Sequence, residues 1–227
     1  MGKRIRAQRK GLSRKYRSPK HKRKGTPYYR KGKGIVVDII HEMGRPLMIV
    51  KMENGEKIKM IAPEGISVGD LIEIGEGEPK IGNVLPLEKI PEGMPIFNIE
   101  GVPGDGGKYI RSSGSFGFIT GKGKGCTIKL PSKKTKELNK NCLATIGNVS
   151  AGGRIDKPFI KAGIKHKVMK AKGKLYPVTS GVAMNPVDHP FGGRTKPGKS
   201  KSTSRNAPPG AKVGSISSKR TGKKKRR

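Results

Sequence analysis

GIVVDIIHEMGRPLMIVKMENGEKIKMIA, residues 34–62, is the stretch that decides the predicted fold. It contains three short runs rich in β-branched and apolar residues, separated by Gly44-Arg45-Pro46 and by Asn54-Gly55. Asn-Gly between two such runs is a strong signal for a two-residue hairpin turn. A further run, LIEIG, begins at Leu71. Four or five strands in about 50 residues predict a small antiparallel barrel, for which the oligonucleotide-binding (OB) barrel is one common solution.

A second set of short, Gly-bounded runs follows from Asn83 onward. These runs are PIFNIE (95–100), KYIRSSG (108–114), SFGFIT (115–120), CTIKLP (126–131) and CLATIGNV (142–149). Their alternation of apolar and polar residues predicts a second small β-barrel, with a helical turn at KKTKELNK, residues 133–140. We therefore predict a mainly β protein with barrels over residues 34–82 and 83–160. Residues 1–33 and 161–227 are predicted to be basic extensions, the latter rich in Gly and Pro.

Positive charge is concentrated outside a mildly acidic centre, residues 36–110. Residues 1–35 carry 15 Lys and Arg and no Asp or Glu, and residues 111–227 carry 29 basic and three acidic residues. Residues 36–110 instead carry seven basic and 13 acidic residues, within a chain of net charge +35. Because neutralised phosphates release condensed counterions, this pattern predicts a folded body with arms that bind a polyanion.

Several other classes of protein are disfavoured by the sequence. No apolar run approaches the roughly 18 residues that cross a bilayer, and the basic N-terminus lacks the apolar region of a signal peptide. Cys126 and Cys142 lack a second C-x-x-C half, so we expect two ordinary thiols and no metal site. These features predict a reducing, cytoplasmic location.

One motif matches a nucleotide-binding pattern letter for letter. Residues 193–200 read GRTKPGKS, which satisfies G-x-x-x-x-G-K-S. A phosphate loop needs a buried strand before it and a helix after it, whereas HPFGG precedes this segment and Pro208-Pro209 follows it. We therefore expect no nucleotide hydrolase.

His189, within GVAMNPVDHPFGG at residues 181–193, is the residue with the strongest catalytic potential. An imidazole titrates near neutral pH, and Asp188 adjoins it. No Ser or Cys nucleophile can be placed beside it from the sequence, and Pro186 and Pro190 indicate an extended loop. We expect a structural or ligand-contacting role and no catalytic residue.

The same stretch carries a resemblance that extends over nearly the whole chain. GVAMNPVDHPFGG, with RIDKPFIKAGIKH, KAKGKLYPVTS, IPEGMPIFNIE, GDGGKYIRSSGSFGF, CLATIGNVSAGGR and NAPPGAKVGSISSKRTG, resembles the universal L-two family of large-subunit ribosomal proteins. The short N-terminal arm and the spelling HPFGG are similar to the archaeal and eukaryotic branch. Phe191, where bacterial members usually have a second His, and Arg194, where many members continue a glycine run, depart from the family pattern.

The resemblance implies an OB barrel followed by an SH3-like barrel, both docked on large-subunit rRNA. It implies a non-enzymatic structural protein that helps organise the peptidyl transferase centre and supports subunit association and tRNA binding. Its partners would be rRNA, neighbouring ribosomal proteins and the small subunit at the intersubunit face. It implies no cofactor of its own, with Mg²⁺ present only through bound rRNA. The loop near the peptidyl transferase centre maps onto Asn185, Pro186, Val187, Asp188, His189 and Pro190.

Sixteen basic residues are our predicted RNA contacts, with Tyr16, His21 and the pair Tyr28-Tyr29 as aromatic groups for stacking on unpaired bases. They are Arg14, Lys15, Arg17, Lys20, Lys22 and Arg23 in the N-terminal arm, Arg111, Lys122, Lys124, Lys129 and Arg154 in the second barrel, and Lys199, Lys201, Arg205, Arg220 and Lys223 in the C-terminal extension. A flexible hairpin with solvated lysines is the alternative for GKGKG at 121–125, and a nuclear-targeting or heparin-like basic patch is the alternative for the arm. The alternative for the whole chain is a general nucleic-acid packaging protein.

Overall fold

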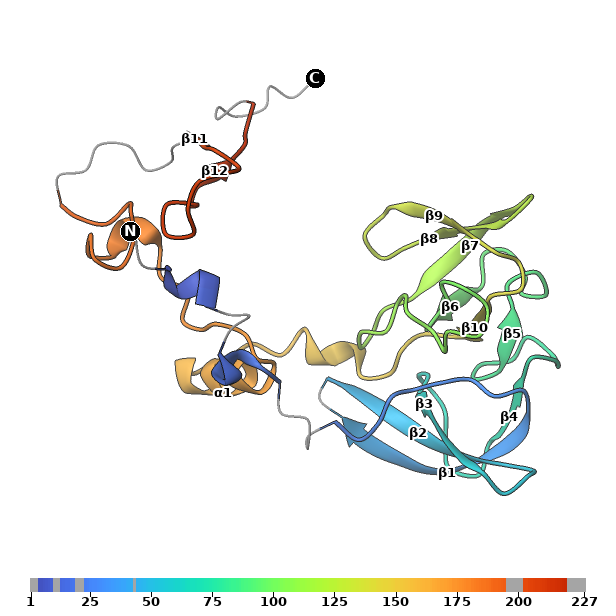
Figure 1. Ribbon diagram of the computed structural model, residues 1–227. Coiled ribbons are helices and arrows are strands. Elements are labelled where there is room, and N and C mark those ends of the chain that lie inside the picture. Colours follow the sequence, from blue (N-terminus) through green and yellow to red (C-terminus); the bar gives the residue numbers. More distant parts are fainter. Residues whose placement is uncertain (1–3, 10–12, 19–22, 43, 195–201, 220–227) are drawn as a thin grey trace. The chain divides into compact units, whose positions relative to one another are not determined.

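The computed structural model describes residues 4–9, 13–18, 23–42, 44–194 and 202–219. Two compact units emerge: residues 20–158 form one, and residues 1–19 together with 159–227 form the other. The protein is mainly β, as predicted, with a ten-stranded sheet in the first of these units (Figure 1). The predicted barrel boundaries, 34–82 and 83–160, are not the boundaries of these units and stay predictions.

Four strands make up the N-terminal part of the sheet, in the order β3-β2-β1-β4. They are β1 (Gly32–Glu42), β2 (Arg45–Met52), β3 (Lys57–Ile61) and β4 (Leu71–Ile74). The predicted Asn-Gly hairpin is present, since Gly55 has φ +81° and the Met52 amide donates to the Glu56 carbonyl at 2.8 Å. Alternate residues such as Ile58 and Met60 on β3 point into a core that also contains Val36, Met48 and Ile72.

Six further strands continue the same sheet in the order β5-β10-β6-β7-β8-β9. They are β5 (Val84–Pro86), β6 (Pro95–Phe97), β7 (Gly117–Lys122), β8 (Cys126–Lys129), β9 (Thr135–Leu138) and β10 (Leu143–Ile146). A second core forms beneath them, with Leu85, Ile96, Ile119 and Ile128 almost fully buried. This arrangement is consistent with an OB barrel followed by an SH3-like barrel.

Two sequence predictions in this region are wrong. KKTKELNK does not form a helical turn: its central residues are β9, which pairs with β8 from Cys126↔Leu138 to Lys129↔Thr135. Strand pairing buries Leu138 in the second core, whereas a lone helical turn would leave β8 without a partner on that side. KYIRSSG is mostly loop, and only Tyr109 forms a bridge, to Ile99.

The two parts of the sheet share contacts at their junction. β4 and β5 pair in parallel at Ile74↔Val84, and Val84 and Leu143 belong to the core of the first four strands. A polar cluster lies at the same junction, where the Tyr29 hydroxyl donates to the Asn98 carbonyl at 2.6 Å and lies 2.7 Å from Thr145 Oγ1. Tyr29 also packs against the first core, so it anchors the chain before β1 and is not free to stack on a base, contrary to the prediction.

The other unit is built from both ends of the chain. It contains the 3-10 helices η1 (Arg6–Arg9), η2 (Arg14–Tyr16) and η5 (Gly181–Ala183), the helix α1 (Ala162–Ala171), and a short parallel pair, β11 (Ser202–Thr203) and β12 (Ser215–Ile216). The 3-10 helix η4 (Gly152–Arg154) belongs to the sheet-containing unit. Helix α1 was not predicted. Within the described residues, no helix is long and apolar enough to cross a membrane.

The N-terminal arm contacts the C-terminal half within this unit. Ser18 Oγ donates to the Ala171 carbonyl at the end of α1, at 3.1 Å. Gly173 ends the helix with φ +65°, and a Cβ there would lie 2.5 Å from the Tyr16 carbonyl oxygen. Further along, Gln8 Nε2 donates to the Lys212 carbonyl at 3.1 Å. The segments predicted as two separate extensions therefore pack on each other.

Candidate nucleic-acid interface

The loop that contains His189 is closed by its own backbone. The amides of Asp188 and His189 donate to the Asn185 carbonyl at 3.0 and 3.2 Å, and the Gly193 amide donates to the Met184 carbonyl at 3.1 Å. Two prolines, Pro186 and Pro190, fix φ on either side of this turn. The loop is thus preorganised, with the Val187 side chain 76% exposed at its surface.

The His189 imidazole has a defined orientation within this loop. The Phe191 amide donates to His189 Nδ1 at 3.0 Å, and the two rings lie 5.1 Å apart between centroids. Gly181 is needed beneath the ring, because a Cβ there would lie 2.3 Å from the imidazole Cε1. Since Nδ1 accepts a hydrogen bond, the neutral ring carries its proton on Nε2. The Nε2–H group is therefore the hydrogen-bond donor of the neutral His189 ring.

Three arginines of the N-terminal arm lie beside this loop. Arg4, Arg6 and Arg9 line a hollow of about 460 Å³ together with Thr179, Met184, Val187 and Asp188. All three arginines are exposed, as are Val187 and Asp188. Three cations around one hollow, with a single carboxylate among its lining residues, create a positive potential that suits a phosphate backbone. These arginines are not among the RNA contacts predicted from the sequence.

Ten of the 16 predicted RNA-contact residues lie in described segments, and most of these are exposed. Arg14, Arg17, Arg23, Lys124, Lys129, Arg154 and Arg205 are exposed, and Lys122 is exposed while donating to the Glu88 carbonyl at 2.6 Å. Arg111 is half-buried and donates to the Gly107 carbonyl at 2.9 Å. Lys20, Lys22, Lys199, Lys201, Arg220 and Lys223, the side chain of Lys15, and most of the GRTKPGKS segment lie outside the described residues. These contacts stay predictions.

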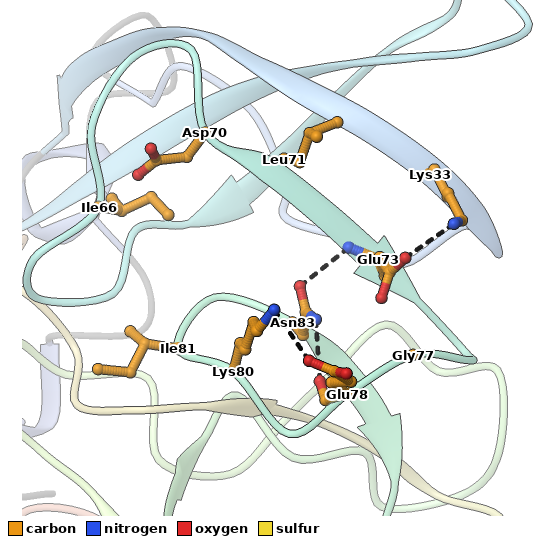
Figure 2. Close-up of a pocket in the computed structure, with 10 residues that line it drawn as sticks. All are labelled: Lys33, Ile66, Asp70, Leu71, Glu73, Gly77, Glu78, Lys80, Ile81 and Asn83. Carbon is orange, nitrogen blue, oxygen red and sulfur yellow. Dashed lines mark hydrogen bonds and ion pairs between the residues drawn. The ribbon is translucent and has the colours of Figure 1, made fainter.

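A groove beside β4 has a different character (Figure 2). It has a volume of about 600 Å³, and its lining includes Asp70, Glu73 and Glu78. Its two lysines are paired, Lys33 with Glu73 at 2.9 Å and Lys80 with Glu78 at 2.8 Å. The hydrogen bond from Lys33, followed by its charge, holds the pKa of Glu73 below its usual range. This groove is therefore a poor site for a phosphate.

The possible metal ligands of the described part of the chain include its two cysteines. No group of three or more His, Cys, Asp or Glu side chains is arranged there to hold a metal ion. Cys126 and Cys142 are free and buried, and burial raises the pKa of both thiols. Both cysteines are thiols, as predicted.

A mainly β body with clustered arginines and cationic arms is typical of the proteins that assemble with RNA. Residues 80–214 match the family model described as the C-terminal domain of ribosomal proteins L2. The large ribosomal subunit protein uL2 of Methanococcus vannielii is 51% identical over 240 residues, which cover 99% of this chain and all of that protein. The Haloarcula marismortui uL2 is 50% identical over 236 residues, 98% of each chain, and the Methanocaldococcus jannaschii uL2 is 51% identical over 242 residues. The chain belongs to the uL2 family of large ribosomal subunit proteins, as the sequence motifs indicated.

Proposed function

We propose that this ribosomal protein binds large-subunit rRNA and is held there by its arms and its second barrel. The observation that carries the proposal is the hollow in which Arg4, Arg6 and Arg9 meet the loop of residues 185–190. Phosphates bound by these arginines would fix the loop against RNA, next to the peptidyl transferase centre. The protein would thereby support tRNA binding, and association with the small subunit at the intersubunit face. Neighbouring ribosomal proteins would be its other partners, in the cytoplasm.

The proposed role is structural and not catalytic. His189 Nδ1 already accepts the Phe191 amide, so this nitrogen does not serve as a general base in the arrangement described. The Nε2–H group can donate to an acceptor on RNA, such as a phosphate oxygen or a base edge. Peptide bond formation would belong to the RNA. Mg²⁺ would enter only with bound rRNA, where it neutralises phosphates.

Specificity for rRNA is tested by a competition titration. Folded large-subunit rRNA competes with mixed-sequence RNA of equal length at about 0.3 M salt, where nonspecific phosphate binding falls steeply. We expect the rRNA complex to survive and the mixed-sequence complex to dissociate. Equal loss of both complexes would instead favour a general nucleic-acid packaging protein.

Replacing His189 by Ala should leave rRNA binding nearly unchanged but slow peptide bond formation by the subunit. We expect rRNA affinity to change by about twofold or less, because one neutral contact is lost among many phosphate contacts. Peptide bond formation by reconstituted subunits should fall several-fold, because the Nε2–H donor is removed. Filter binding and a single-turnover assay measure the two quantities, with Val187→Ala as the control on the same loop. An affinity loss as large as that from deleting residues 1–33 would contradict this separation.

A further inference from the structure

The groove beside β4 forms where two neighbouring strands diverge. In the described sheet, β4 and β5 pair at Ile74↔Val84 alone, so the earlier part of β4 has no partner strand on that side (Figure 2). Asn83 links the two walls of this space, since its Oδ1 accepts the Glu73 amide at 3.0 Å and its Nδ2 donates to the Glu78 carbonyl at 2.9 Å. The β4 groove, about 600 Å³ in volume, is therefore held open by the fold itself.

The β4 groove lies in an acidic segment of a strongly cationic chain. Residues 60–79 contain five Asp or Glu and no Lys or Arg, although the whole chain has a net charge of +35. Lys33 and Lys80 also line the groove, but each is paired with a carboxylate, at 2.9 and 2.8 Å. Asp70 forms no ion pair within the described part of the chain, and its Oδ2 accepts the Ser67 amide at 2.7 Å. With three carboxylates and two ammonium groups, the lining is net negative and repels a phosphate backbone.

Large aliphatic side chains are exposed on the walls of the same groove. Leu71 on β4 is 71% exposed, and Ile81 on the opposite wall is 61% exposed. Ile35, which faces Leu71 across the β1–β4 pair, is also exposed and extends this apolar surface onto β1. An exposed apolar surface bordered by charged groups is typical of a protein-binding site, because a partner removes its aliphatic area from water. None of the described lining residues has an aromatic ring on which a base could stack.

We propose that the β4 groove binds an extended, Lys- and Arg-rich segment of another protein, with aliphatic residues between its cations. The cations would pair with Asp70 and with the second carboxylate oxygens of Glu73 and Glu78, each of which uses one oxygen for a lysine. The aliphatic side chains of the segment would cover Leu71 and Ile81. Such a segment meets opposite charge in the groove, whereas RNA would place phosphates beside carboxylates. The inference rests on the proposed function only for its setting, a particle in which other proteins also carry basic segments.

Two synthetic peptides of equal charge test the chemistry of this partner on the full-length protein. One repeats Lys-Leu-Lys-Gly three times, and the other repeats Lys-Ser-Lys-Gly three times. We expect the Leu peptide to bind about fivefold more tightly than the Ser peptide, because only its side chains cover the apolar walls. Leu71→Thr and the double variant Glu73→Gln/Glu78→Gln should each weaken its binding about fivefold, measured by fluorescence anisotropy. Val102→Thr and Glu92→Gln are the matched controls and should bind it like the wild type, because both side chains are exposed on the same unit and neither lines the groove.

A thiol on β4 reports what covers the groove in the assembled particle. Cys126 and Cys142 are buried, so a maleimide should react with the Leu71→Cys variant at its new, exposed thiol. We expect similar labelling rates in the free protein and in its complex with rRNA alone. Labelling should become several-fold slower once the other proteins of the large subunit are added.

Three results would overturn this assignment of the groove. Protection of the thiol by rRNA alone would assign the groove to RNA, and protection that rises with the concentration of the free protein would assign it to a second copy of the chain. Unchanged labelling after the other proteins are added, with equal binding of the Leu peptide by groove variants and controls, would show that no basic segment binds there. The proposed function fails separately, if rRNA has no advantage over mixed-sequence RNA in the competition titration.

Discussion

Replacing Arg4, Arg6 and Arg9 together by Gln should weaken binding to large-subunit rRNA by about 30- to 80-fold at 0.2 M salt. Each phosphate contact contributes about 0.7–0.9 kcal/mol at this salt concentration, and the three arginines line one hollow beside the loop of residues 185–190. The slope of log K against log salt should decrease by about two to three units. Filter-binding titrations between about 0.1 and 0.4 M salt measure both quantities in a range where K changes strongly.

The matched control for this arm variant is the triple substitution of Lys51, Lys57 and Lys89 by Gln. These lysines are exposed on the sheet-containing unit and are not among the predicted contacts, so the same charge is removed elsewhere. We expect this control to bind rRNA nearly as well as the wild type. Equal losses in the two triple variants would show that the net charge of the chain, and not the arm, determines affinity. Gln retains good helix propensity, so η1 should persist in the arm variant.

Most of the strands could be predicted because their signals are local. The Asn54-Gly55 turn fixes the register of β2 and β3, and the alternation Ile58, Met60 identifies the buried face. The helical turn predicted at KKTKELNK is wrong because the single apolar residue of this segment, Leu138, gives no periodicity. The choice between helix and strand therefore depends on the partner strand β8. Helix α1 was missed because the Lys- and Gly-rich sequence around it has the composition of an extension, and its sequence contributes no fully buried residue.

The candidate sites were harder to predict than the strands, because they depend on contacts between distant residues. The β4 groove brings Lys33 beside residues 66–83, and the hollow joins Arg4–Arg9 to residues 179–188. Charge density along the chain instead selected runs such as RKYRSPKHKRK, where many basic residues are close in sequence. The prediction that Tyr29 stacks on an unpaired base is wrong for the same reason. Its hydroxyl contacts Asn98 and Thr145, which lie far along the chain and could not be paired with it from the sequence. Sequence composition therefore predicts a polyanionic ligand, but it cannot identify groups of residues that meet only in the fold.

Replacing Glu100 by Ala should lower the free energy of unfolding by about 3–5 kcal/mol, the largest effect on stability that we expect. Glu100 is 1% exposed, and its carboxylate accepts three backbone amides: Gly104 at 3.2 Å, Gly106 at 3.1 Å and Leu143 at 2.9 Å. Ala cannot accept any of them, so buried donors lose their partner in a loop that is otherwise held by Asp105. Urea unfolding of the full-length protein, followed by circular dichroism, measures the difference.

Two further variants distinguish this mechanism from a general loss of negative charge. Glu76→Ala removes an exposed carboxylate and should change stability by less than about 0.5 kcal/mol. Glu100→Gln keeps one acceptor oxygen but places an N–H₂ group among amide donors, so its effect should lie between the two. Amide hydrogen exchange at Gly106 and Leu143 should accelerate in Glu100→Ala more than exchange at Ile58 of the first core. A loss below about 1 kcal/mol, with unchanged exchange at Leu143, would mean that water replaces the carboxylate and that Glu100 does not hold the loop against β10.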